Sequence, residues 1–142
     1  MTGHIFLGLM RLEALKKTRL HDSIYSADIV LLAELVMLGE FHEVAEPLFY
    51  RRVHSESGWN KHTPVGVVAF EDPTKRGKIL LPHWRLAFEL ARSLASARIS
   101  ISDKLRCFPD IVLWYWRFWK NLARDLLVAG KLAMHSAPLE YR

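Results

Sequence analysis

Asp28 is the side chain whose position best suits acid–base chemistry. It falls in the first turn of a helix predicted for residues 27–38, because Ser26 is a favourable N-cap and Gly39 can end the helix. The positive end of a helix dipole stabilises a carboxylate, so Asp28 is expected to be ionised and able to accept a proton. Stabilisation of the helix itself is an equally simple role for an aspartate here.

A second group of polar side chains consists of Arg51, Arg52 and His54, at the end of a strand predicted for residues 48–53. Alternation along a strand places Arg51 on one face and Arg52 and His54 on the other. At most one of these sets can therefore face a ligand. An exposed basic strand without a ligand explains the same pattern.

Metal binding by this chain alone is not expected. The seven histidines show neither close pairing nor helical i, i+4 spacing: His4, His21, His42, His54, His62, His83 and His135. Cys107 is the only cysteine, which excludes an internal disulfide, and its apolar helical context favours a packed thiol.

The composition predicts a folded domain with a preference for anionic partners. The chain has 142 residues, of which 51% are hydrophobic, and its formal net charge is +5. The start of the sequence lacks a secretory signal, so a cytoplasmic location is the default expectation. The longest strongly apolar run, residues 111–116, is far shorter than the roughly 20 residues needed to span a bilayer.

The elements expected to position these side chains divide the chain into three parts. Residues 1–56 are predicted to contain strands at 5–10, 41–44 and 48–53, with helices at 11–19 and 27–38. Residues 57–80 form a linker rich in turn signals. Residues 81–134 form a helical tail, with a helix from Pro82 to about residue 97 and another from Ser102 that is broken or kinked near Pro109 and stops at Gly130.

The last helix is amphipathic and rich in aromatic residues. Its aromatic side chains lie beside basic ones: Trp114, Tyr115, Trp116, Phe118 and Trp119, with Arg117, Lys120 and Arg124. Such a helix could contact a membrane surface through residues 102–129. Packing inside the protein or against another subunit would use the same apolar face.

Three ordered segments carry a resemblance to a known family. They are residues 5–11 (IFLGLMR), 26–35 (SADIVLLAEL) and 46–54 (EPLFYRRVH), followed by 70–78 (FEDPTKRGK) and 81–85 (LPHWR). In this order and spacing the chain resembles the C-terminal part of bacterial family 2 glycosyltransferases. The resemblance implies an α/β fold: residues 1–56 would be the C-terminal, acceptor-side piece of a GT-A (nucleotide-diphospho-sugar transferase) domain, followed by a helical tail.

The resemblance also implies roles for individual residues. Asp28 matches the aspartate that acts as the general base on the acceptor hydroxyl, although Ile29 stands where the family often has a basic residue. Arg51, Arg52 and His54 match a substrate-binding segment near the donor diphosphate. A divalent metal, Mg or Mn, is expected for the complete enzyme, and its ligands would lie mostly in a donor-binding half that this sequence does not contain.

Two functions therefore follow as hypotheses. The first is a glycosyltransferase fragment that helps to transfer sugar from a nucleotide sugar to an envelope or lipid-linked acceptor, at the inner face of the plasma membrane, and that is inactive alone. The second is a non-catalytic module that binds a membrane surface or another protein. Nucleic-acid binding ranks below both, because the basic residues are dispersed and accompany no recognised motif.

Overall fold

The structure of the protein is a computed structural model that describes residues 7–20, 23–46, 48, 50, 63–76 and 78–135. Of these residues 68% are helical, and none of them belongs to a strand. The elements are α1 (Leu12–Leu15), α2 (Ala27–Val36), α4 (Pro64–Glu71), the short 3-10 helix η2 (Pro73–Lys75), α5 (Pro82–Ser96) and α6 (Ile101–His135).

The predicted α/β fold, a piece of a GT-A domain, was therefore wrong. Residues 8–10 and 41–44 were expected in strands, yet they form neither helix nor strand, and Leu7 has a 3-10 conformation. Most of the third expected strand, including residues 51–53, lies outside the described residues. A strand needs a neighbour that pairs with its backbone N–H and C=O groups, and short apolar runs alone do not specify one.

The two helices predicted in the first part are present with changed ends. α2 begins at Ala27 as expected, but Ser26 has a left-handed backbone (φ 57°) and its side chain makes no capping hydrogen bond. Helix α1 covers only Leu12–Leu15 of the residues expected to be helical. The start of α2 was thus predicted correctly, but the predicted capping hydrogen bond from the Ser26 hydroxyl is not formed.

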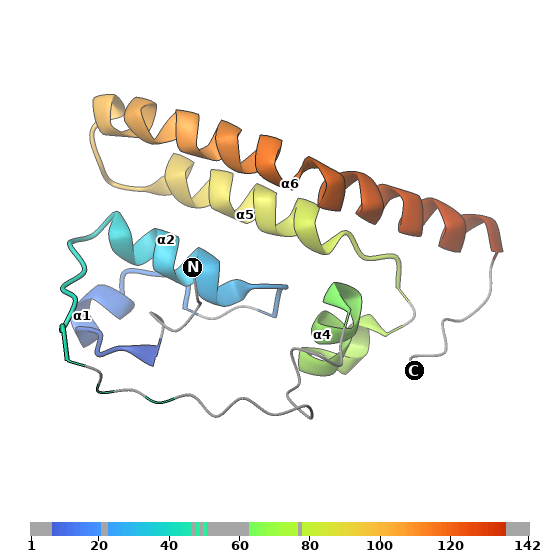
Figure 1. The fold of residues 1–142 in the computed structure, drawn as a ribbon, viewed down its shortest axis with the longest axis horizontal. Coiled ribbons are helices and arrows are strands. Elements are labelled where there is room, and N and C mark those ends of the chain that lie inside the picture. Colours follow the sequence, from blue (N-terminus) through green and yellow to red (C-terminus); the bar gives the residue numbers. More distant parts are fainter. Residues whose placement is uncertain are drawn as a thin grey trace.

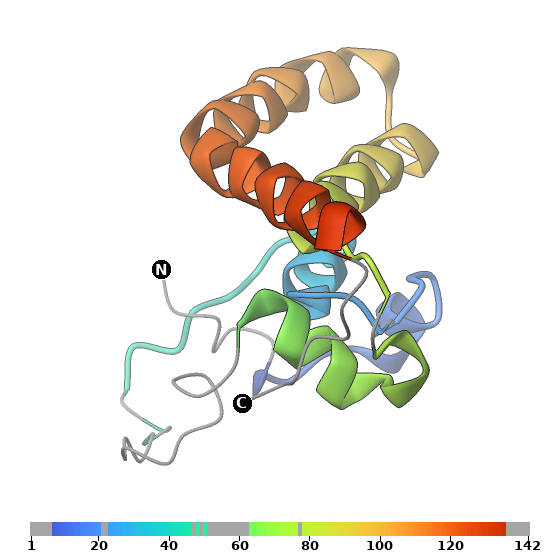
Figure 2. The same cartoon turned by 90° about the vertical axis from the view of Figure 1, so that its right-hand side faces the viewer.

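The helical tail was predicted more closely. α5 begins at Pro82, whose fixed φ suits the first helical position and whose missing N–H costs nothing there. α6 continues through Pro109 and past Gly130, so the helix is not broken at Pro109 and the predicted stop at Gly130 was wrong. Pro109 removes one backbone hydrogen bond from the helix, and Figure 2 shows α6 curving along its length.

Helices α2, α4 and α6 pack on α5: α6 lies beside it on one side, and α2 and α4 contact it from the other (Figure 1). Figure 1 shows α5 and α6 antiparallel and side by side, with α2 against α5 and α4 near the first turn of α5. The apolar core lies between α2 and α5 and contains Ile24, Ala27, Val30 and Leu86. Tyr25, Leu90 and Trp114 pack against this cluster. α5 is therefore the central element that positions the others.

Candidate functional site

Asp28 lies in the first turn of α2, as predicted, and is partly buried. Its carboxylate forms no hydrogen bond or ion pair with any residue that the structure describes. It does not cap the helix, because the N-cap is Ser26.

The predicted substrate-binding residues cannot be related to Asp28. Arg51, Arg52 and His54 all lie outside the described residues. Within the described ranges, no group of three His, Cys, Asp or Glu side chains is arranged to hold a metal ion. Asp28 is therefore the one predicted site residue whose surroundings are defined.

A polar network that the sequence did not reveal is centred on Arg19, between α1 and α2. The Arg19 backbone N–H and Nε donate to the Glu34 carboxylate, at 2.8 and 2.6 Å. The Arg19 guanidinium also binds the Glu89 carboxylate and donates to the Ser93 hydroxyl at 2.6 Å. Ser93 in turn donates to Glu34 at 3.0 Å. One arginine thus ties α2 to α5.

These contacts change the protonation equilibria of the network. Burial opposes ionisation of the Arg19 guanidinium, but its hydrogen bonds and charge interactions with Glu89 and Glu34 outweigh burial and raise its pKa. Burial likewise opposes ionisation of Glu34. The backbone N–H and guanidinium of Arg19, together with the Ser93 hydroxyl, outweigh that effect and lower the pKa of Glu34. Both groups are therefore held in their charged forms.

Glu89 is the most deeply buried charged group in the described part of the chain, with 1% of its surface exposed. Besides Arg19, two arginines of its own helix lie near it: Arg85 at 2.8 Å and Arg92 at 3.6 Å. Glu89 Oε1 is within ion-pair distance of Arg85 but accepts no hydrogen bond of good geometry from the described residues. The i, i+4 and i, i+3 spacings of these residues were a visible sequence signal.

A second polar contact joins the start of α5 to α6. The Asp125 carboxylate accepts a hydrogen bond from the His83 backbone N–H at 2.7 Å, and its other oxygen lies 2.9 Å from His83 Nδ1. Both side chains are nearly buried. Close by, Trp84 Nε1 donates to the Leu122 carbonyl at 3.0 Å. Asp125 thus satisfies a free N–H at the α5 N-terminus, and this explains its burial without a catalytic role.

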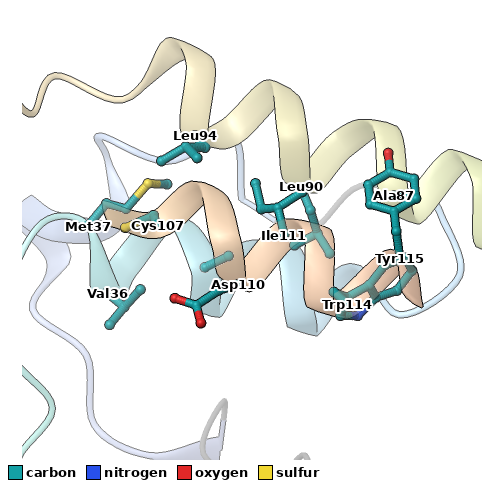
Figure 3. Close-up of a pocket in the computed structure, with 11 residues that line it drawn as sticks. Val36, Met37, Ala87, Leu90, Leu94, Cys107, Asp110, Ile111, Trp114 and Tyr115 are labelled. Atoms are coloured by element: carbon teal, nitrogen blue, oxygen red, sulfur yellow. The ribbon is translucent and has the colours of Figure 1, made fainter. Parts of the chain in front are cut away.

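An apolar pocket of about 230 Å³ lies between α2, α5 and α6 (Figure 3). Its walls come from all three helices: Ala33, Val36, Met37, Ala87, Leu90, Leu94, Cys107, Asp110, Ile111, Trp114 and Tyr115. Asp110 is the only charged residue among them. The pocket can take an apolar group, but it offers no acid–base pair for chemistry.

No family model, curated protein or solved structure matches this chain. Among the described helices, none is both long enough and apolar enough to cross a membrane. The candidate site therefore rests on Asp28, and the clearest alternative surface is that of α6.

Proposed function

We propose that the chain is the acceptor-side part of a glycosyltransferase. The ordered segments around residues 5–11, 26–35 and 46–54 support this proposal by their resemblance to family 2 enzymes. The observation that carries it is the Asp28 carboxylate, which lies at a helix N-terminus without a partner among the described residues. An aspartate in a first helical turn also stabilises the helix through its dipole without a specific partner, so the two roles are separated by the variant described below.

In this proposal Asp28 is the general base. Its carboxylate accepts the proton of an acceptor hydroxyl while that oxygen attacks the anomeric carbon of the donor sugar, with inversion. The bond to the nucleoside diphosphate breaks, and the departing diphosphate takes the bonding electron pair. Arg51, Arg52 and His54 would stabilise the negative charge that develops there.

A separate donor-binding part completes this reaction. It would hold the nucleotide sugar, and an Mg or Mn ion there would neutralise charge on the diphosphate. The acceptor would be an envelope glycan or a lipid-linked one, at the cytoplasmic side of the membrane. The isolated chain should therefore show no sugar transfer with common nucleotide sugars.

The test is a chimaera in which this chain replaces the matching segment of an active family 2 glycosyltransferase. Transfer of a radiolabelled sugar is measured for the chimaera and for its Asp28→Asn variant. Asparagine keeps the shape of the side chain but cannot take the proton, so kcat should fall by roughly 10²- to 10⁴-fold with little change in fold.

The matched control is Asp110→Asn, which makes the same chemical change at an exposed position of α6. It should leave kcat unchanged. Chimaera activity that survives Asp28→Asn would reduce Asp28 to a helix residue. Sugar transfer by the isolated chain would contradict the need for a donor-binding part.

A non-catalytic interaction module is the second candidate function. The observation that favours it is the large number of exposed apolar side chains on α6, such as Trp116 and Trp119. In such a module α6 would carry the function and Asp28 would have none. Vesicle or partner binding together with an inactive chimaera is the result that would favour it.

A further inference from the structure

Helix α6 has an inner face and a separate outer apolar strip. Its inner face packs against α5 and the core through residues such as Trp114 and Leu122. The outer strip consists of nine apolar side chains, each more than half exposed: Ile101, Leu105, Phe108, Val112, Trp116, Trp119, Leu126, Leu127 and Met134. At about 100° per residue, all nine fall within a sector of roughly 100° of the helix surface.

The outer strip contains no charged residue and runs the length of the helix. Residues 101–134 span roughly 50 Å at about 1.5 Å per residue. Scattered surface hydrophobic residues need no explanation, but a continuous strip of this kind marks an interaction surface. The described part of the chain does not cover this strip.

A cationic row borders the strip on one side. In the adjoining sector of about 60°, the exposed charged side chains are all basic: Arg106, Arg117, Lys120, Arg124 and Lys131. The three acidic residues of α6 lie farther round the helix: Asp103 and Asp110 beyond this row, and Asp125 on the inner face. The Asp103 carboxylate accepts a hydrogen bond from the Ser100 hydroxyl at 2.6 Å and lies 3.8 Å from Arg106 of the row.

We infer that this outer face of α6, the apolar strip with its cationic row, lies on the surface of an anionic lipid bilayer. The strip would enter the boundary between headgroups and acyl chains, and the row would meet the anionic headgroups. Two tryptophans, Trp116 and Trp119, belong to the strip. Indole rings prefer the headgroup region of a bilayer, where this strip would lie. The inference goes beyond sugar transfer and holds whether or not Asp28 is a base.

The structure changes which aromatic residues contact lipid. Trp114, Tyr115 and Phe118, which the sequence suggested for this role, are partly buried on the inner side. Trp114 packs against the core and stacks on Phe118, with ring centroids 4.7 Å apart. Membrane binding therefore does not require α6 to leave α5, because a second apolar face is already exposed.

Charge complementarity favours a lipid surface over other occupants. A nucleic acid would be met by cations and stacked aromatic rings along a groove, whereas here the cations only border an apolar strip. In an antiparallel two-fold contact, a second copy of the chain would bring its cationic row beside the first row, and the two rows would repel each other. An anionic bilayer offers an apolar interior for the strip and negative headgroups for the cationic row.

The experiment is co-sedimentation of the purified chain with vesicles of phosphatidylcholine, with or without an equal part of phosphatidylglycerol. We expect binding to the anionic vesicles that weakens as salt rises, because salt screens the cationic row. Tryptophan emission should shift to shorter wavelength on binding as Trp116 and Trp119 leave water. Absence of binding to the anionic vesicles would overturn the inference.

Variants of the outer face separate its two parts. Trp116→Ser with Trp119→Ser should abolish the emission shift and most binding. Arg117→Glu with Arg124→Glu should weaken binding to anionic vesicles by at least about tenfold. All four side chains are exposed, so the far-ultraviolet circular dichroism should not change.

The matched control makes the same charge change away from the face. Lys17→Glu with Arg98→Glu alters two exposed residues outside α6 and should bind almost as the unaltered chain does. Equal weakening by this control would overturn the inference, since net charge alone would then explain binding. A dimer that the two serine substitutions dissociate, with no vesicle binding, would assign the face to a second copy.

Discussion

The packing of α2 on α5 has two ends of different chemistry. At one end Ala27 and Val30 of α2 meet Leu86 of α5 in an apolar cluster. At the other end Glu34 of α2 meets Glu89 and Ser93 of α5 through the guanidinium of Arg19. The same pair of helices is thus held by burial at one end and by charge at the other.

The difference shows what each kind of contact contributes. Apolar burial stabilises the helix pair in any orientation that removes the same surface from water. The Arg19 network is directional, because each donor must meet a fixed acceptor. We infer that the polar end selects the rotation and register of α2, while the apolar end supplies most of the attraction.

The largest effect is expected from breaking the polar end with Glu89→Ala. This change removes the buried carboxylate and leaves Arg19, Arg85 and Arg92 close together without it. Loss of one partner of a buried ion pair costs about 3–5 kcal/mol. The three guanidinium groups keep access to water, so we expect the lower value, about 3 kcal/mol, in urea-induced unfolding.

Glu71→Ala is the control for this prediction, because Glu71 is an exposed glutamate at the end of α4. It should change the free energy of unfolding by less than about 0.5 kcal/mol. If both substitutions had equally small effects, the network would be incidental and the apolar end would hold the helices alone.

A smaller loss is expected from breaking the apolar end with Leu86→Ala. Leu86 is 3% exposed and is the α5 member of the core cluster. Truncation of a buried leucine costs about 2–5 kcal/mol, and we expect the lower value, about 2 kcal/mol, because the cluster is small. Leu113→Ala removes the same atoms from an exposed site on α6 and should have almost no effect. A larger loss for Leu86→Ala than for Glu89→Ala would reverse the ranking of the two ends.

The helices with the clearest start signals and apolar stripes were predicted best from the sequence. α5 has a proline at its start and one apolar stripe, so its range was predicted almost to the residue. α2 is apolar on nearly every side, so its buried face was not fixed by periodicity. Two of its apolar residues, Ile29 and Val36, are exposed. Glu34 lies on the inner face instead, where Arg19 binds it.

Contacts between distant residues account for most of what the sequence did not reveal. Arg19 and Glu89 are 70 positions apart, and no local pattern links them. Pro109 and Gly130 are local helix breakers, yet α6 continues through both, and beside Pro109 the residues Cys107 and Ile111 line a pocket shared with α5. Short apolar runs predicted strands, but the described part of the chain contains no strand. The position of Asp28 at a helix start was readable from the sequence, but its lack of a partner among the described residues was not.

The smallest expected effect is the pH dependence of stability. Only the polar end of the α2–α5 contact should lose stability in acid, because it contains the ionised Glu34. The pKa of Glu34 is lowered: burial opposes its ionisation, but the hydrogen bonds from Arg19 and Ser93 prevail. In the unfolded chain a glutamate has a pKa of about 4.3, so at that pH the unfolded state binds more protons than the folded state. The stabilisation from Glu34 is therefore complete above this pH and is lost as pH falls through the lower, folded pKa.

Glu34→Gln tests this pH dependence, because the amide resembles the carboxyl in shape but does not ionise. The variant should be less stable than the unaltered chain near neutral pH, and its stability should decline less steeply in acid, so that the two curves converge at low pH. Urea unfolding between about pH 7 and about pH 3 measures both curves. Leu86→Ala should lower the whole curve without changing its acid slope, since no titrating group is removed. Parallel curves for Glu34→Gln and the unaltered chain would place the acid sensitivity outside the Arg19 network.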